Sequence, residues 1–353
     1  MLLLKSTQLI NLINIVLGIL CSKSVLITDI GSELGDFYTD GLEESKLKRI
    51  YRFFTNERIN AERVYDFFAT QMLRRYKPWD KKLIIIFDHT TIEDRFTILQ
   101  FSMRIGTRAI PLWYKMFKYD DKNNKQFIHV KEGLLKVYEM IKAYNFEVIV
   151  LADRGFKSVD LFNFIDEKLK WKYCIRCTKD VYVKIENKIM KLQDIKPLKK
   201  KTKYYNGVKL TEQEYTCNLA ICKDEESLDT WFLIHNFESN IAVNEYKKRF
   251  TIEEMFKDFK KGGFNLESTW TENLTYARNL YLCISIAYTW MITLGISCTK
   301  DKNNKILGVM KKIKGKKVRI FSLFRTGLMW FKRCLNSSKN KIFLKFDIII
   351  YGF

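Results

Sequence analysis

The spacing of apolar and polar residues divides the chain into helical and strand-like stretches. Up to about residue 75, apolar residues recur every three or four positions with basic residues between them, as in "SKLKRIYRFFTN" and "NAERVYDFFATQMLRRY". This is the period of amphipathic helices. Unbroken apolar runs of strand length follow in "KKLIIIFDHTTI", "FTILQFSMRI" and "RAIPLWYKMF", with a short turn at Gly106 between the last two. The pattern therefore predicts a helical beginning followed by three strands.

Further along, the pattern predicts a mixed sheet with an insertion. A helix in "HVKEGLLKVYEMIKAYN", a strand in "FEVIVLADRGF", a helix in "SVDLFNFIDEKLK" and a strand in "KYCIRCT" follow in that order. Three strands, helix, strand, helix and strand are typical of a mixed α/β sheet. From about residue 180 to 237 the pattern is all-β, and Asn206-Gly207 indicates a two-residue hairpin turn. Helices resume from Asn244, so a β-rich segment is predicted to interrupt an α/β fold.

One apolar run and the cysteines give information about the cellular location of the protein. Residues 280–298 carry no charge, and this run is almost long enough to span a membrane. It nevertheless contains several Tyr, Ser and Thr side chains. We interpret this run as a central buried helix and expect no membrane contact. The Cys174-x2-Cys177 pair lies on a predicted strand, where residues three apart face opposite ways. Buried, reduced cysteines are therefore favoured over a metal site, and a cytoplasmic location is expected.

The charge of the chain indicates an acidic partner. The formal net charge is +22 and the isoelectric point is about 9.5. Nucleic acid fits this excess best, with an anionic membrane second, although a generally lysine-rich composition gives the same number. The basic residues are dense near the end, where residues 300–345 hold 15 Lys or Arg and one acid, Asp301.

We divide the chain into five parts. They are a helical N-terminal DNA-binding region (1–76), the first part of a catalytic domain (77–180), a β-rich insertion (181–238), the second part of the catalytic domain (239–299) and a basic C-terminal region (300–353).

Two aspartates are candidates for chemistry. Asp88 and Asp153 each end an apolar run that is predicted to be a strand. Functional groups of open α/β sheets gather at the carboxyl ends of strands. Neighbouring carboxylates repel each other, so a pair at one edge needs a cation to coexist. Carboxylate oxygens suit Mg²⁺ or Mn²⁺.

A third carboxylate is expected from the stretch "NEYKKRFTIEEMFKDFKKGG". On a helical wheel of 100° per residue, four side chains share an arc of roughly 60° beside the apolar face. They are Tyr246, Arg249, Glu253 and Lys260. The wheel places Glu254 and Asp258 on the solvent side. An ordinary ion-pair stripe explains the arc equally well, but a carboxylate beside Arg and Lys also suits a phosphodiester at a metal.

The spacing of these four residues is specific. Tyr-x2-Arg-x3-Glu-x6-Lys resembles the Y-R-E-K signature of bacterial insertion-sequence transposases, the fourth insertion-sequence family, at every position and gap. "FDHTTI" and "VLADRGF" are similar to the first two blocks of the family's DDE triad, and the chain order of two Asp, a β-rich insertion and a Glu agrees. The resemblance covers roughly residues 45 to 335.

The resemblance implies a fold, a reaction and a partner. It implies a ribonuclease-H-like mixed sheet flanked by helices, and cut-and-paste DNA transposition through a hairpin intermediate. Asp88, Asp153 and Glu253 would hold two divalent metal ions, Mg²⁺ or Mn²⁺. The partners would be inverted-repeat transposon ends and target DNA, bound by a homodimer in a nucleoid-associated, cytoplasmic complex.

The resemblance also implies DNA contacts. Tyr246, Arg249 and Lys260 would contact phosphates near the transposon end. Arg176 would contact the DNA end, with a plain surface arginine as the alternative. Trp231 would stack on a flipped base, with a core tryptophan as the alternative.

Two other functions stay open on the residues. One is a metal-dependent DNA nuclease of the same fold without strand transfer. The other is a non-catalytic protein that only binds transposon ends.

Overall fold

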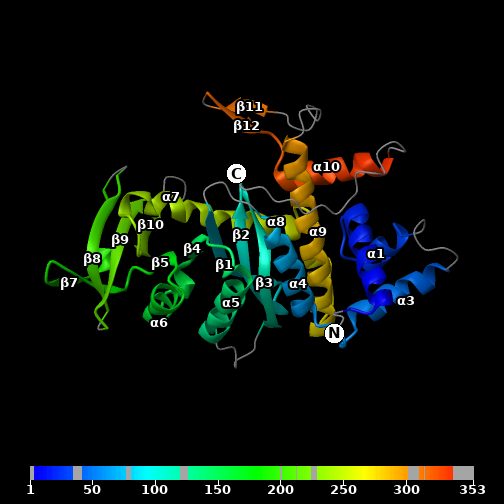
Figure 1. Cartoon of the computed structure of the whole chain (residues 1–353), viewed down its shortest axis with the longest axis horizontal. Coiled ribbons are helices and arrows are strands. Elements are labelled where there is room, and N and C mark those ends of the chain that lie inside the picture. The colour runs from blue at the N-terminus through cyan, green and yellow to red at the C-terminus, as the bar shows by residue number, and fades with distance from the viewer. Residues whose placement is uncertain are drawn as a thin grey trace.

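Four helices precede the first strand, in agreement with the helical spacing of this region. The computed structural model describes residues 4–34, 42–76, 81–119, 126–198, 201–211, 213–223, 229–300, 310–313 and 315–336. The four helices are α1 (Ser6–Ser22), α2 (Ile27–Ser32), α3 (Glu43–Phe54) and α4 (Ala61–Arg74). They lie beside the long helix α9 (Leu274–Lys300), as Figure 1 shows. The side-chain amide of Asn279 on α9 donates to the carbonyl of Phe54 at 2.9 Å, which ties α3 to α9.

The strands form one ten-stranded sheet. Its order is β3-β2-β1-β4-β5-β10-β9-β8-β6-β7. The first five strands in the chain are β1 (Lys82–Ile92), β2 (Phe96–Ile105), β3 (Arg108–Lys118), β4 (Glu147–Ala152) and β5 (Lys172–Cys177). β1, β4 and β5 are mutually parallel, whereas β2 and β3 run antiparallel to their neighbours. The fold is therefore a mixed α/β sheet with flanking helices, as predicted, and Gly106 lies in the short turn between β2 and β3.

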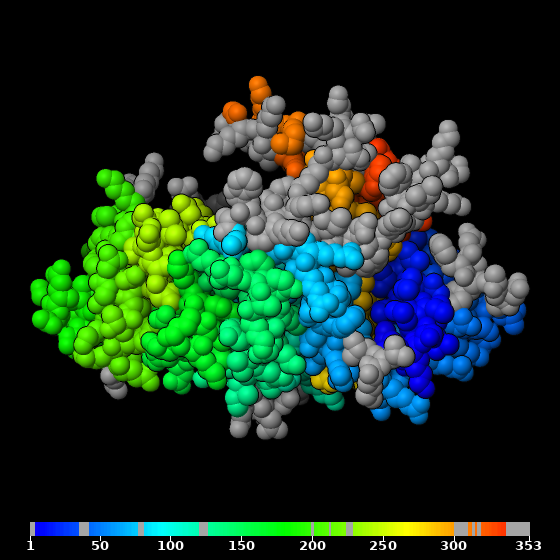
Figure 2. Space-filling model, in the orientation of Figure 1, coloured from blue at the N-terminus to red at the C-terminus, as the bar shows by residue number. Residues whose placement is uncertain are grey.

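The β-rich insertion continues this sheet. Its strands are β6 (Tyr182–Ile185), β7 (Lys188–Lys191), β8 (Lys203–Leu210), β9 (Tyr215–Lys223) and β10 (Thr230–His235). β10 pairs with β5 in antiparallel orientation, so the insertion adds five strands to the sheet beside β5. In the space-filling view, the insertion lies at one end of the long axis and the N-terminal helices at the other (Figure 2).

The hairpin turn predicted at Asn206-Gly207 is wrong. Both residues lie inside β8, where the register with β9 shifts between Tyr205 and Val208, and Gly207 has a φ of 64°. The chain reverses between the end of β8 at Leu210 and the start of β9 at Tyr215. A residue with positive φ occurs in some β-bulges as well as in tight hairpin turns, so the same dipeptide suits either one.

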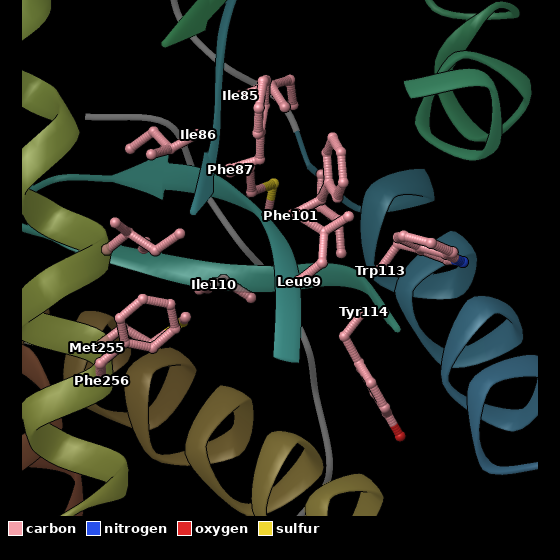
Figure 3. Close-up of a cluster of buried hydrophobic side chains, with 14 of the residues drawn as sticks. Ile85, Ile86, Phe87, Leu99, Phe101, Ile110, Trp113, Tyr114, Met255 and Phe256 are labelled. Atoms are coloured by element: carbon pink, nitrogen blue, oxygen red, sulfur yellow. The ribbon is translucent and has the colours of Figure 1, made fainter. Parts of the chain in front are cut away.

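Helices cover both faces of the central strands. α5 (Gln126–Ile141) lies against the face that carries Phe101, and Gly133 allows the close approach because a Cβ there would collide with the Phe101 ring. The next residue, Ser102, points to the other face, where its hydroxyl lies 3.7 Å from the sulfur of Met255 on α8 (Thr251–Phe259). Figure 3 shows this core, with Met255 and Phe256 packed against the strands. The packing fixes α8 against the sheet.

The remaining helices complete the body. They are α6 (Val159–Asn163), which continues into a π-helical turn (Phe164–Lys168), α7 (Ala242–Lys247) and α10 (Leu323–Asn336), which packs on α9. A two-stranded hairpin of β11 (Met310–Ile313) and β12 (Lys316–Arg319) precedes α10. The apolar window of α9 is 94% buried, which confirms the prediction of a central core helix. The basic C-terminal region predicted over 300–353 lies partly outside the described residues.

Candidate active site

Two of the predicted carboxylates lie at one edge of the sheet. Asp88 stands on β1 two residues beyond Ile86, the last residue of β1 that pairs with the parallel strand β4. Asp153 directly follows β4 and precedes a 3-10 turn over Arg154–Phe156. β1 continues to Ile92, so the prediction that this strand ends at Asp88 is wrong. The pairing of β1 with its parallel neighbour β4 ends at Ile86, however, and both aspartates follow the paired segments, so they lie at the same edge of the β1–β4 pair.

The stretch with the third carboxylate is three segments instead of one helix. It consists of α7, a 3-10 turn over Lys248–Phe250, and α8. The wheel of 100° per residue therefore does not hold throughout, because a 3-10 turn advances about 120° per residue. The solvent-facing position predicted for Asp258 is wrong: it is 8% exposed and accepts a hydrogen bond of 2.9 Å from Arg108 Nε. Arg108 comes from β3, so the pattern of the helix alone could not show this partner.

Arg249 joins two of the predicted carboxylates. Its guanidinium donates to Asp88 Oδ2 at 2.8 Å and to Glu253 Oε1 at 2.5 Å, and the residue is 5% exposed. The hydroxyl of Tyr246 donates to Asp153 Oδ1 at 3.3 Å. The structure thus brings all three predicted catalytic residues to the α7–α8 segment, each held by a residue of the predicted stripe.

The carboxylates also influence one another electrostatically. Burial raises the pKa of Asp88 to about 6, and the Arg249 guanidinium and the backbone N–H of His89 oppose this rise. The negative charges of Asp153 and Glu253 raise the Asp88 pKa further. Burial lowers the pKa of Arg249, but Tyr246 and the three carboxylates outweigh it, and the net shift is upward. The guanidinium is therefore the cation that lets these charges coexist.

The donor chemistry of the cluster fits a divalent metal ion, but the present spacing does not. In the described part of the chain, no three His, Cys, Asp or Glu side chains are close enough together to hold one ion. Arg249 occupies the space between Asp88 and Glu253. Three carboxylates supply the hard oxygen ligands that Mg²⁺ prefers, provided that the guanidinium releases two of them.

The other predicted DNA-contacting residues lie outside this cluster. Lys260 caps the end of α8 and pairs with Glu267 at 3.1 Å. Arg176, on β5, pairs with Asp229 at 3.0 Å. Trp231, on β10, is 3% exposed and lies edge-on to the Tyr246 ring at 5.3 Å. Base stacking by Trp231 stays a prediction, because in this structure the ring is covered.

Sequence reasoning did not single out two neighbours of the cluster. Phe250 is 36% exposed, and its ring centroid lies 4.9 Å from the Arg249 guanidinium. His89, the residue after Asp88, donates its backbone N–H to Asp88 Oδ1 at 2.9 Å and stacks its ring on Phe156. The only sign of Phe250 in the sequence is that an aromatic residue directly follows Arg249. An apolar residue at this position could equally belong to the core.

Two solved structures align with this chain. A solved piggyBac transposase synaptic complex with hairpin DNA aligns over 96% of this chain and 76% of its own, with 13% identity and a TM-score of 0.47. An Argonaute from Marinitoga piezophila, solved with guide RNA and target DNA, aligns over 70% and 34% with 15% identity and a TM-score of 0.22. No curated protein matches the chain.

A model of a protein family matches most of the sheet-forming part of the chain. The model described as "Transposase DDE domain" matches residues 79–290, which contain β1 to β10, α7, α8 and all three predicted catalytic carboxylates. The match extends over more than half of the 353 residues. The chain belongs to the transposase DDE-domain family.

Proposed function

We propose that this transposase is a cut-and-paste enzyme of the fourth insertion-sequence family, in which Asp88, Asp153 and Glu253 are the catalytic carboxylates. The observation that carries the proposal is the convergence of these residues on the segment whose spacing matches Y-R-E-K. Arg249 binds two of the carboxylates and Tyr246 binds the third. A stripe of ordinary surface ion pairs would not reach partly buried aspartates that belong to two neighbouring strands or directly follow them.

The three carboxylates would hold the two divalent metal ions that the family resemblance implies. Such ions activate a water and then a DNA 3′-hydroxyl, and stabilise the in-line displacement at phosphorus. The role of the protein is to position oxygen ligands at the edge of a rigid sheet. Arg249 would release Asp88 and Glu253 and turn its two N–H groups to a DNA phosphate, which is a bidentate partner of the same geometry.

The finer features of the reaction rest on the family resemblance. They include the hairpin intermediate and the roles of Lys260, Arg176 and Trp231 at the DNA end. A ribonuclease-H-like core is supported by the order β3-β2-β1-β4-β5, in which an antiparallel meander precedes two parallel strands. Pairing of two ends by a homodimer and a nucleoid location follow from the same resemblance.

The N-terminal helices line a hollow that is rich in basic side chains. A hollow of about 820 Å³ lies among α1, α3 and the start of α4. Six basic residues line it: Lys5, Lys48, Arg49, Arg52, Arg58 and Arg63. Its described lining includes no carboxylate, and the other polar lining residues are amides and hydroxyls. This supports residues 1–76 as a DNA-binding region, with affinity that falls as salt rises.

Cleavage of DNA by matched glutamate variants tests the proposal. The wild type, Glu253→Gln and Glu254→Gln are each incubated with Mg²⁺ and linear DNA that carries the inverted repeats flanking the coding sequence. Glu254 is the control because it lies on the same helix and pairs with Lys257 at the surface. We expect Glu253→Gln to lower the cleavage rate at least about a hundredfold and Glu254→Gln to change it little.

The products separate the alternatives. Joining of the cut ends to a second DNA supports transposition, whereas cleavage without joining indicates a nuclease. Binding without cleavage by the wild type indicates a protein that only binds ends. Full cleavage by Glu253→Gln contradicts the assignment of the third carboxylate.

A further inference from the structure

Trp270 is the most exposed large apolar side chain in the part of the chain that the structure describes. It is 85% exposed. Four other tryptophans, at positions 113, 171, 231 and 290, are at most 8% exposed. A tryptophan offers a large flat surface whose exposure to water is unfavourable, and aromatic residues of this kind are typical of binding surfaces.

The backbone on both sides of Trp270 is fixed. The Arg95 guanidinium donates to the carbonyl of Thr269 and, at 3.1 Å, to the carbonyl of Thr271. Thr269 is itself only 4% exposed, and its N–H donates to the carbonyl of Leu266 at 3.3 Å. The indole is therefore presented to solvent by an ordered loop that is anchored immediately before and after it.

This loop lies at the edge of the sheet that carries the catalytic carboxylates. Arg95 belongs to the turn between β1 and β2, beyond the end of β1, the strand that bears Asp88. The four residues from Asp88 to Ile92 span roughly 13 Å at the rise of a β-strand. That distance corresponds to about four base pairs of duplex DNA. A DNA segment at the carboxylates therefore extends far enough to reach this loop.

Basic and acidic side chains are mixed around the loop, and Asp94 and Glu272 are exposed there. Lys260 is held by Glu267 at 3.1 Å, and the next residue, Lys261, is exposed. The nearby acid Glu93 is neutralised by Arg95 at 2.9 Å. Lysines can hold phosphates beside an aromatic ring that takes the base, which is the arrangement that binds single-stranded or unpaired nucleotides.

We infer that Trp270 stacks on a nucleobase of the bound DNA, a few base pairs from the phosphate that is cleaved. This rests on the proposed function, because it assumes that DNA occupies the carboxylate edge. Stacking of one base on an aromatic side chain changes affinity by roughly 5-fold to 150-fold upon replacement by alanine. Trp270→Phe should retain most of the affinity, because the phenyl ring still offers a stacking face.

Tryptophan fluorescence tests the inference without relying on catalysis. The probe is a duplex carrying one inverted repeat, with a few unpaired nucleotides beside the position of cleavage, mixed with the protein in the absence of metal. The difference in emission between the wild type and Trp270→Phe reports Trp270. We expect this emission to be red-shifted and readily quenched by acrylamide before DNA is added, and protected afterwards. DNA anisotropy should give the predicted loss of affinity for Trp270→Ala.

Tyr182→Ala is the matched control, because Tyr182 is another large exposed aromatic residue, at 52%, and lies on β6, outside the proposed DNA-binding region. Equal DNA affinity of the wild type and Trp270→Ala, with unchanged quenching of Trp270, overturns the inference and leaves the proposed function intact. Protection of Trp270 that appears with protein concentration alone, together with dimer formation in sedimentation, also overturns it, since a second copy then covers the ring. Absence of any DNA binding by the wild type refutes the proposed function itself.

Discussion

Replacing Arg249 by glutamine removes the cation at the centre of the candidate site. The guanidinium is 5% exposed and holds Asp88, whose side chain is 20% exposed, and Glu253, whose side chain is 42% exposed. Removing one partner of a buried ion pair typically costs roughly 3–5 kcal/mol, because the remaining charge has no counter-charge. The more exposed pair with Glu253 adds less than about 1 kcal/mol.

We therefore expect metal-free Arg249→Gln to lose roughly 3–5 kcal/mol of its free energy of unfolding at neutral pH. Urea unfolding followed by tryptophan fluorescence measures this loss. Lys248→Gln is the control, because Lys248 is the neighbouring residue and pairs with Glu245 at 2.7 Å, outside the carboxylate cluster.

A second variant separates the lost charge pair from lost packing. Arg249→Gln combined with Asp88→Asn has no unpaired carboxylate at position 88, so we expect it to regain much of the stability. Saturating Mn²⁺ should also stabilise Arg249→Gln, by about 2.7 kcal/mol at a hundred times the dissociation constant. A loss below about 0.5 kcal/mol for the single variant, or a double variant no more stable than the single one, would refute the reasoning.

Two further variants test the packing and the charges around the site. Burial raises the Asp258 pKa to about 6, above its usual 3.8, so its contribution to stability falls as pH rises through that window. The free energy of unfolding of Asp258→Asn minus that of the wild type should therefore rise by about 2 kcal/mol between pH 4 and pH 7, measured in urea. Gly327→Ala should destabilise α10 by about 1–3 kcal/mol, because its Cβ would collide with the carbonyl of Met291 on α9. Gly155→Ala is its control, because no atom lies within 4 Å of a Cβ there, and equal urea midpoints for the two variants would contradict the packing argument.

The sequence predicted the elements of the central sheet because their apolar runs are long and their ends are polar. It also predicted which glutamate of the adjacent pair lies beside Arg249: Glu253 contacts Arg249, whereas Glu254 pairs with Lys257. The hairpin at Asn206-Gly207 was wrong because positive φ serves bulges and turns alike.

The long-range contacts could not be predicted from local patterns. Asp258 is buried because a partner, Arg108, arrives from β3, 150 residues earlier in the chain. The bridge from Arg249 to Asp88 joins residues 161 positions apart. A helical wheel places side chains on faces but contains no information about what another element brings to that face.

The most direct test of the central claim replaces Asp153 by cysteine and compares DNA cleavage in Mg²⁺ and in Mn²⁺. A thiolate is a poor ligand for Mg²⁺ and a better one for softer ions. If Asp153 binds the catalytic metal, Asp153→Cys should not cleave inverted-repeat DNA in Mg²⁺, and Mn²⁺ should restore part of the activity, whereas the wild type cleaves in both. Cleavage by Asp153→Cys at the wild-type rate in Mg²⁺ would contradict the account.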